Sequence, residues 1–242
     1  MAKHLTTGYP LQDYYSRIYK TYDLVNRLFT FRLDKKWRRH TVVACLESQP
    51  ERILDLCCGT GDLAISISRT AVNSVRITGF DLNPNMLDIA RQRAFRFNTT
   101  NIEFVQGDAG STPFKDNEFD CITIGFGFRN LTFKNPNRDQ YILEISRIMK
   151  PGARLLILES SRPDNRIIGF FYRLYLKIFL VPLGGLLSGH WHAYRYLAGS
   201  SADFYSFPAL CKMLEDYQLS LQIKKKYLFG SVNLLIATKK GM

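Results

Sequence analysis

The stretch ILDLCCGTGD, residues 53–62, decides the fold of this chain. It continues an apolar run from Arg52 to Leu56 that is typical of a buried strand, and its two glycines, Gly59 and Gly61, stand where a helix would begin. A glycine in such a tight turn has no Cβ to obstruct a ligand that approaches the backbone. The stretch therefore predicts a strand, a loop that lies against a ligand, and a helix.

The same alternation of short apolar runs and longer helical periods continues to residue 158 and predicts βαβ units. The expected strands are Arg52–Leu56, Val75–Phe80, Ile102–Val105, Cys121–Ile124 and Arg154–Leu158. The expected helices are Asp62–Thr70, Pro84–Phe97 and Asn137–Met149, the last ended by the turn Lys150-Pro151-Gly152. This order predicts an α/β fold, a doubly wound, mostly parallel, Rossmann-like sheet.

Further elements flank this core. Residues 11–47 carry aromatic and apolar residues at helical spacing, and we expect helices there that pack over one edge of the sheet. Ser220–Leu228 and Val232–Thr238 flank a Gly-Ser turn and predict an antiparallel pair, which brings the sheet to seven strands. We expect one domain over residues 1–242, divided into N-terminal helices (1–50), a cofactor-binding core (51–163), an apolar acceptor or lid region (164–206) and a C-terminal helix with antiparallel strands (207–242).

The composition argues against several classes of protein. The N-terminus lacks the basic, apolar and small-residue order of an export signal, so we expect a cytoplasmic protein. The net charge of +12 favours anionic surfaces, but the basic residues carry no nucleic-acid-binding signature, so we expect no nucleic-acid partner. The cysteines are odd in number and lack metal-site spacing, which predicts reduced thiols and no metal; they are Cys45, Cys57, Cys58, Cys121 and Cys211.

Carboxylates near the glycine loop indicate which ligand binds. Asp81 closes the next strand, 20 residues after Gly61, where it can accept hydrogen bonds from both hydroxyls of a ribose. Asp55 and Asp62 bracket the loop and would repel a pyrophosphate, whereas they would stabilise the ammonium and sulfonium of S-adenosylmethionine. We therefore expect Asp55, Asp62 and Asp81 to line one pocket for a cationic nucleoside. The glycine spacing also fits a relaxed dinucleotide fingerprint, so an NAD-dependent oxidoreductase stays open.

The next two strand ends extend this ligand site. Gln106-Gly107-Asp108-Ala109 follows the third expected strand, where a side-chain acceptor can meet the amine of adenine and the Ala109 backbone can donate. Gly125-Phe126-Gly127-Phe128-Arg129-Asn130 follows the fourth, where the glycines leave space for the reacting methyl group. Ligands of open α/β sheets bind outside the carboxyl ends of the strands, so we expect these loops to converge.

At this point the chain resembles the class I S-adenosylmethionine-dependent methyltransferases, and more closely the ubiquinone/menaquinone biosynthesis C-methyltransferase family. The similarity extends from about residue 15 to the C-terminus. The runs that carry it are Tyr22-Asp23-Leu24-Val25-Asn26, Trp37-Arg38-Arg39, residues 55–62, residues 119–124, residues 125–130, Leu158-Glu159-Ser160-Ser161-Arg162-Pro163 and Tyr194-Arg195-Tyr196-Leu197.

The resemblance implies methyl transfer from S-adenosylmethionine to a ring carbon of a reduced polyprenyl quinol. Demethylmenaquinol is the favoured acceptor; the benzoquinol precursor of ubiquinone, a sterol and RNA stay open. The expected cofactor contacts are Asp55, Gly59, Thr60, Gly61, Asp62, Asp81, Leu82, Asp108, Ala109 and Gly125. The chain departs from the family pattern on the expected substrate side, at Phe128, Ser160 and Ala198, which leaves the ring type open.

The acceptor carbon must be electron-rich to attack a sulfonium methyl group, so the substrate is expected to be the reduced quinol. Arg129 and Asn130 are the catalytic candidates beside it, because a guanidinium can stabilise a developing phenolate or orient a water molecule. A proton relay through water to Asp81 or Asp108 is a further hypothesis. Weaker catalytic candidates are Tyr22, His190 and His192.

Residues 167–187 form the most apolar long stretch, interrupted by Arg173 and Lys177 one helical turn apart. They make a poor membrane span and predict a helix at the bilayer interface or a lid over a lipophilic acceptor, while an ordinary core helix stays open. The expected partner is the lipophilic quinol. Peripheral contact with an anionic membrane surface, at the inner face of the cytoplasmic membrane, and a homodimer are left open.

Overall fold

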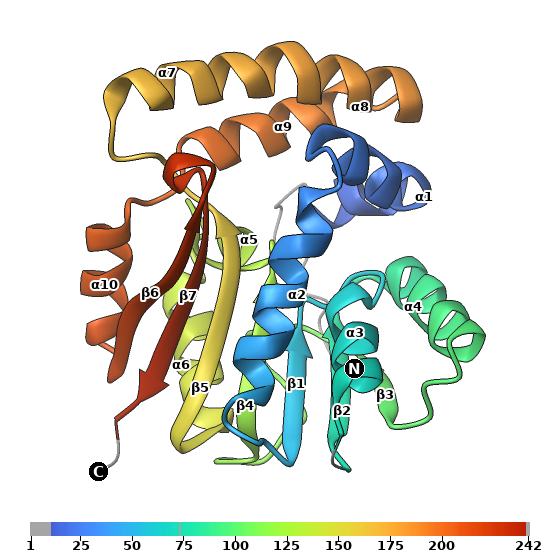
Figure 1. Ribbon diagram of the computed structural model, residues 1–242, viewed down its shortest axis with the longest axis vertical. Coiled ribbons are helices and arrows are strands. Elements are labelled where there is room, and N and C mark those ends of the chain that lie inside the picture. The colour runs from blue at the N-terminus through green and yellow to red at the C-terminus, as the bar shows by residue number, and fades with distance from the viewer. Residues whose placement is uncertain (1–10, 73, 241–242) are drawn as a thin grey trace, which may run out of the picture.

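The computed structural model describes residues 11–72 and 74–240, so the predicted absence of an export signal concerns residues outside this range. One sheet holds the strands in the order β3-β2-β1-β4-β5-β7-β6 (Figure 1). Strands β1 to β5 run parallel, and β7 runs antiparallel to both β5 and β6. Their bounds are Arg52–Leu56, Arg76–Asp81, Ile102–Gln106, Phe119–Gly125, Met149–Ser160, Leu219–Tyr227 and Val232–Lys239, from β1 to β7. The predicted fold class is confirmed.

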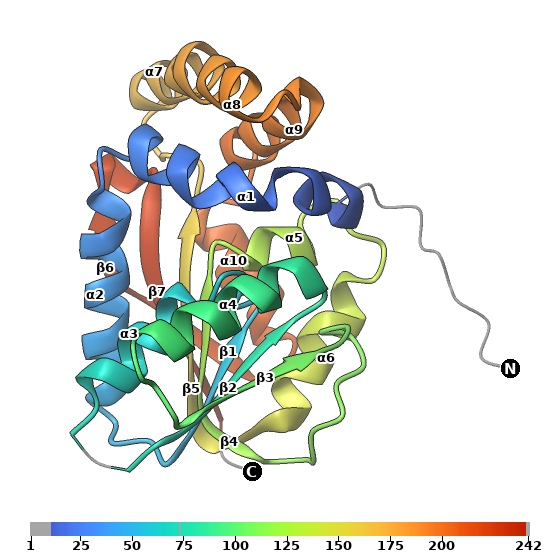
Figure 2. The same ribbon diagram turned by 90° about the vertical axis from the view of Figure 1, so that its right-hand side faces the viewer.

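Helices cover both faces of the sheet, which is why its central strands are apolar along nearly their whole length. On one face, α2 (Leu33–Leu46) packs over β4 and β5, and α3 (Asp62–Thr70) packs over β2 and β3, around Trp37 and Leu63. On the other, α6 (Arg138–Ile148) and α10 (Phe207–Glu215) pack around Ile145 and Leu214. The helix α4 (Pro84–Arg96) lies beside β2 and β3 (Figure 2).

Two expectations about these elements need correction. The turn predicted at residues 150–152 lies inside β5, because Met149 already pairs with Phe119 of β4 and the strand continues through Gly152, whose φ is 76°. The N-terminal helices do not lie along an edge of the sheet. The helix α2 covers a face, while α1 (Leu11–Phe29) crosses above the carboxyl ends of the strands (Figure 2).

A layer of helices lies above the same ends of the strands (Figure 1). It consists of α7 (Arg166–Tyr175), a π-helical turn (Leu176–Leu180) and α8 (Val181–Ser188), followed by α9 (Trp191–Ala202). We call residues 166–202 the canopy. Its inner side packs on α1 around Ile18, Val25 and Tyr194. The canopy therefore roofs the end of the sheet where an α/β fold binds its ligands.

Candidate active site

A cavity of about 210 Å³ opens at the carboxyl ends of β1 to β4 and is called here the sheet-end cavity. Its floor is made by the loops that follow these strands, and its wall is made by α1 and α4. The residues that line it include Tyr15, Tyr22, Asp23, Arg38, Cys57, Gly59, Thr60, Asp62, Asp81, Leu82, Asp108, Ala109, Gly125, Phe126 and Asn130.

The Asp81 carboxylate is held in one orientation by the backbone around it. The Gly59 N–H donates to Oδ2 at 2.8 Å, and the Asn83 N–H donates to Oδ1 at 2.9 Å. Burial raises the pKa of Asp81, and these backbone hydrogen bonds partly oppose that rise. The site thus presents a preoriented carboxylate at the end of β2, the arrangement that receives ribose hydroxyls in such folds.

The glycines of the loops have two different roles, access for a ligand and close packing. Gly59, with a φ of 54°, has no neighbouring atom within 4 Å of where a Cβ would stand, so a ligand can approach this side of its backbone while its N–H bonds to Asp81. A Cβ on Gly125 would come within 2.8 Å of Leu63 Cδ1, and one on Gly127 within 2.6 Å of Cys57 Cβ. These two glycines are therefore required by close packing as well as by the space that the sequence suggested.

Asp55 does not line the sheet-end cavity. Its Oδ1 accepts from the Thr123 hydroxyl at 2.9 Å and its Oδ2 from the Ala64 N–H at 3.0 Å, so it joins β1 to β4 and to the start of α3. Burial raises the pKa of Asp55 to about 7. The structure thus gives Asp55 a structural role beneath the cavity and does not place it in the lining, where the predicted contact would require it.

Asp62 lines the cavity, but its charge is compensated within the protein. Arg93 Nη1 lies 3.1 Å from it, and the guanidinium groups of Arg38 and Arg27 lie 3.8 and 3.9 Å away. The three carboxylates therefore do not form one negative pocket. Of Asp55, Asp62 and Asp81, only Asp81 both lines the cavity and has no ion pair among the described residues.

The helix α1 is fastened over the sheet-end cavity at two points. The Thr60 hydroxyl donates to Asp23 Oδ2 at 3.0 Å, and Asp23 forms an ion pair with Arg93 at 2.5 Å. Farther along the helix, Asn83 Nδ2 donates to the Ser16 hydroxyl at 3.1 Å. The Thr60 hydroxyl, predicted to contact the cofactor, is thus engaged by α1.

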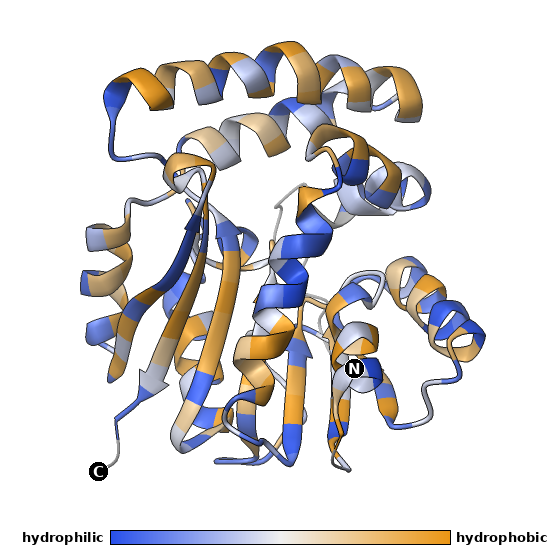
Figure 3. Cartoon of the chain, in the orientation of Figure 1, coloured by the Kyte–Doolittle hydropathy of each residue, from blue (hydrophilic) through white to orange (hydrophobic). Residues whose placement is uncertain are grey.

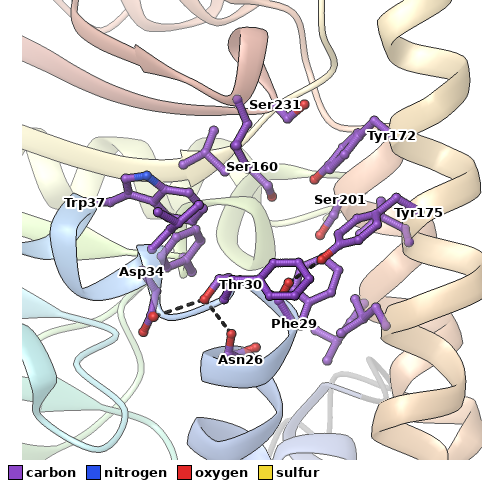
Figure 4. A pocket seen from close by; sticks show the side chains of 18 of the residues that line it. Asn26, Phe29, Thr30, Asp34, Trp37, Ser160, Tyr172, Tyr175, Ser201 and Ser231 are labelled. Atoms are coloured by element: carbon purple, nitrogen blue, oxygen red, sulfur yellow. Dashed lines mark hydrogen bonds between the residues drawn. The ribbon is translucent and has the colours of Figure 1, made fainter.

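A second cavity, of about 350 Å³, lies between the canopy, the α1–α2 turn and the short helix η2 (Leu228–Gly230), and is called here the apolar cavity (Figure 4). Tyr172 and Tyr175 of α7 project into it. Its polar edge is formed where the Thr30 hydroxyl donates to the Asn26 carbonyl at 2.7 Å and also lies within hydrogen-bond distance, 3.0 Å, of Asp34 Oδ1. An elongated ligand that is mostly apolar suits such walls.

The two cavities share one wall. Tyr22, Arg38 and Phe126 line both of them, and the Arg38 guanidinium lies 5.4 Å from the centre of the Phe126 ring. Burial raises the pKa of Tyr22, although the cations Arg38 and Arg129 oppose the rise, so its hydroxyl stays protonated and can donate. This wall is where a polar ligand and an apolar ligand can meet.

The helix α5 (Phe128–Thr132) places neighbouring residues on the two sides. Arg129 lines the apolar cavity, where its N–H donates to Glu159 at 3.0 Å and its Nη1 donates to the Ser200 hydroxyl at 2.5 Å. Asn130 lines the sheet-end cavity and donates to the Tyr15 hydroxyl at 3.0 Å. Burial alone would lower the pKa of Arg129, but the combined opposite effect of Glu159 and nearby tyrosines is larger. The pKa is therefore raised, and the guanidinium stays charged.

Sequence comparison decides which family has this arrangement. The profile of the ubiE/COQ5 methyltransferase family matches residues 3–239. The chain belongs to the ubiE/COQ5 methyltransferase family. A demethylmenaquinone methyltransferase of Thermotoga maritima is 41% identical over 203 residues, 84% of either chain. A ubiquinone/menaquinone biosynthesis C-methyltransferase UbiE of Pseudomonas putida is 41% identical over 180 residues, 74% of this chain and 69% of the relative.

Solved structures agree on the fold of this ubiE/COQ5 family member. An O-methyltransferase family protein from Burkholderia thailandensis matches with a TM-score of 0.67 at 16% identity, over 96% of this chain and 64% of the other. A SAM-dependent methyltransferase from Aquifex aeolicus matches with a TM-score of 0.54 at 17% identity, over 78% and 81%. Family membership makes the chain an S-adenosylmethionine-dependent methyltransferase and excludes the NAD-dependent oxidoreductase.

The sheet-end cavity of this ubiE/COQ5 enzyme fits that cofactor. Asp81 is oriented for a ribose, the backbone of Gly59 is open, and Leu82 and Ala109 supply apolar wall for a base. Of the predicted contacts, Asp55 and Gly61 lie outside the lining. Gly61 is needed for packing instead, because a Cβ there would stand 3.0 Å from Ala90 Cβ. His190 and His192 line neither cavity, so the structure gives them no place at the site.

Several residues of this ubiE/COQ5 site received no role from the sequence. Asp23 and Arg93 close α1 over the sheet-end cavity, and Arg38 and Phe126 form the shared wall. Asp23 and Arg38 do stand in runs that carry the family resemblance, at residues 22–26 and 37–39. That signal marked the runs, but the spatial partners that give each residue its role lie far along the chain.

Proposed function

We propose that the chain transfers a methyl group from S-adenosylmethionine to a ring carbon of reduced demethylmenaquinol, in the cytoplasm and at the inner face of the membrane that holds this lipid. The observation that carries the proposal is the shared wall of Tyr22, Arg38 and Phe126 between a cofactor cavity and an apolar one. A methyl donor and a lipophilic acceptor need such a common boundary, because the carbon, the methyl group and the sulfur must align.

The residues at this boundary suit the proposed chemistry. S-adenosylmethionine supplies an electrophilic methyl group when it is bound. Arg129, which stays charged in the apolar cavity, stabilises the negative charge that develops on a ring oxygen. Tyr22 donates a hydrogen bond from the shared wall and orients the ring. Asn130, on the cofactor side, holds Tyr15 of α1 in place through the hydrogen bond to its hydroxyl.

The expected proton relay from Arg129 to Asp81 or Asp108 does not fit the arrangement of the two cavities. Asp81 and Asp108 line the sheet-end cavity, whereas Arg129 lines the apolar cavity, so a relay between them would have to cross the shared wall. Among the described residues that line the apolar cavity, Asp34 is the one with a carboxylate, and we propose that it accepts the proton. Asp34→Asn should lower kcat and leave cofactor affinity unchanged; an unchanged kcat contradicts this assignment.

The decisive experiment is incubation of the protein with labelled S-adenosylmethionine and reduced demethylmenaquinone. The expected product is one methyl group heavier, and the oxidised quinone should give none because it is itself an electrophile. The proposal is overturned if none of the quinols, each supplied in reduced form with detergent, gives a methylated product. A sterol and an RNA serve as further acceptors, and methylation of either in place of the quinols also overturns it.

The ring type has a second candidate, the demethylated benzoquinol precursor of ubiquinone. The relatives from Thermotoga maritima and Pseudomonas putida bear different names at the same 41% identity, so identity does not separate the two acceptors. Both quinols should therefore be compared by kcat/KM in one assay. We expect the naphthoquinol to be preferred, and a higher kcat/KM for the benzoquinol reverses the assignment of the ring.

A further inference from the structure

The outer face of the canopy is apolar and uncovered. Within the described residues, one helix is long and apolar enough to cross a membrane, the continuous run Arg166–Ser188 of 23 residues, yet only 22% of its most apolar window is buried. Its inner side packs against α9 and α1, and it lies across the molecule at the end of the sheet (Figures 1 and 3). A helix held in this way presents its other side outward; the exposed apolar side chains there include Ile167, Phe170, Leu174, Ile178, Phe179, Leu186 and Leu187.

This exposed face is continuous with the mouth of the apolar cavity. Phe171, Phe31 and Phe229 each line the cavity and are also exposed, with relative accessibilities of 61%, 73% and 84%. They come from α7, the α1–α2 turn and η2, three segments that surround the opening. Three phenylalanine rings left in water around one opening are costly unless another apolar phase covers them.

The charged residues within the canopy all have one sign. No aspartate or glutamate occurs from Asn165 to Ala202, a stretch that holds Arg166, Arg173, Lys177 and Arg195. The acidic residues that flank it are paired, Asp164 with Lys226 at 3.5 Å and Asp203 with Arg173 at 3.3 Å. The α1–α2 region beside the mouth adds further exposed cations, which are Arg32, Lys35, Lys36 and Arg39. An anionic leaflet attracts such a surface.

We propose that the outer face of the canopy and the phenylalanine rim together form a docking surface for an anionic lipid bilayer. Docking in this orientation opens the apolar cavity directly toward the acyl chains. A cavity of about 350 Å³ is in the range of small-ligand sites, so a quinol ring enters it while a polyprenyl tail stays in the bilayer. Only this last step rests on the proposed function; the docking itself rests on the exposed rings and the charge.

The apolar part of the surface is tested with the full chain and vesicles of phosphatidylcholine alone or mixed with phosphatidylglycerol. We expect the wild type to sediment with the anionic vesicles. Phe170→Ser/Ile178→Ser, which lies outside both cavities, should lower the partition at least about tenfold because two inserted side chains are lost. The matched control Val72→Ser/Phe95→Ser changes two exposed apolar residues away from the canopy and should bind as the wild type does.

The charged part is tested with Arg166→Gln/Lys177→Gln. Each cation removed should weaken binding to the anionic vesicles about fivefold, and added salt should reduce the difference from the wild type. The matched control Arg96→Gln/Lys212→Gln removes two exposed cations from α4 and α10 and should change the partition little. Because all these residues are exposed, thermal unfolding should show the variants to be folded.

Several outcomes overturn the docking surface. These are a wild type that stays in solution with both kinds of vesicle, and a canopy variant that binds no worse than its control. A further one is a wild type that sedimentation velocity shows to be a dimer and that Phe170→Ser/Ile178→Ser makes monomeric, since a second copy would then cover the face. Methylation of a short-chain quinol in solution by the wild type separates the two proposals. A wild type that binds vesicles but does not methylate this quinol refutes only the function. A wild type that methylates it but does not bind vesicles refutes only the docking.

Discussion

The sheet-end cavity and the apolar cavity share a wall but are built in opposite ways. The first is lined largely by loops that directly follow β1 to β4, and hydrogen bonds such as that from the Gly59 N–H to Asp81 hold it rigid. The second is lined by side chains from α1, α2, the canopy and η2, elements that the chain brings together over great sequence distance. On the proposed function, a cofactor common to many enzymes would bind at the sheet itself, and the acceptor would bind among the helices above it.

The two cavities should therefore respond to different substitutions. Alterations at strand ends should affect cofactor affinity, and alterations above the sheet should affect the acceptor and the rate. The shared wall is where this division should fail, because Tyr22, Arg38 and Phe126 belong to both cavities.

The largest effect is expected at Arg129. Arg129→Ala should lower kcat by about 10² to 10³, since the charge that stabilises a developing phenolate is lost. The dissociation constant of S-adenosylhomocysteine, measured by calorimetry, should change less than about twofold. Because the change leaves Glu159 buried without its cation, Arg129→Lys is the companion variant. Equal losses of rate and cofactor affinity would place Arg129 on the cofactor side and contradict the division of roles between the two cavities.

Asp55 should show the next largest effect, on stability rather than rate. Its pKa of about 7 in the folded protein exceeds the ordinary value of 3.8, so its contribution to stability is full below about pH 4 and is lost as the pH rises through 7. Relative to Asp55→Asn, the wild type should lose up to about 3 kcal/mol of unfolding free energy between pH 5 and pH 8. Urea unfolding at both pH values measures this, and a constant difference between the two proteins contradicts it.

Asp81 tests the cofactor side. Asp81→Asn removes the charge behind the expected ribose contact and should weaken cofactor binding about 10- to 100-fold, the usual range for a hydrogen bond to a charged group. The KM of the quinol should hardly change. Asp88→Asn, on the exposed side of α4, is the control that should leave cofactor binding as it is. A rise in the quinol KM as large as the loss of cofactor affinity would show that the two cavities are not separable.

The smallest effect is expected at Ser200, which acts through Arg129. Ser200→Ala removes the acceptor of the 2.5 Å hydrogen bond from Arg129 Nη1 and should lower kcat about 3- to 10-fold. Cofactor affinity and the KM of the quinol should stay near their wild-type values. A variant that lost its fold would lose cofactor binding as well, so this measurement separates the two causes. The control is Ser188→Ala, at the end of α8 and outside both cavities. An unchanged kcat would remove the canopy from the positioning of Arg129.

The fold could be predicted because its signals are local. The range Asp62–Thr70, expected as a helix from periodicity and the preceding glycine, is the range of α3. The strand ends that carry Asp81 and Asp108 follow from the same pattern, and parallel topology brings them together. Nothing beyond a window of a few residues and a general rule of sheet topology was needed for this part of the site.

The rest depends on pairings between distant segments. Asp55 turns away from the cavity because β1 pairs with β4 in a register that sets it opposite Thr123, 68 residues later. The negative pocket of Asp55, Asp62 and Asp81 that the sequence predicts is therefore not formed, although S-adenosylmethionine as the cofactor is confirmed by family membership. Arg129 and Ser200 are likewise separated by 71 positions in the sequence, so a local pattern gives no signal of their contact.

The fastening of α1 by Asp23 and by Ser16 has a consequence for the order of events in turnover. The helix carries Tyr22, which lines both cavities, so a movement of α1 that released the nucleoside product would also move one wall of the proposed acceptor cavity. On the proposed function, we therefore expect release of the nucleoside product to be coupled to release of the methylated lipid. An enzyme built in this way would lose both at once and begin each cycle empty.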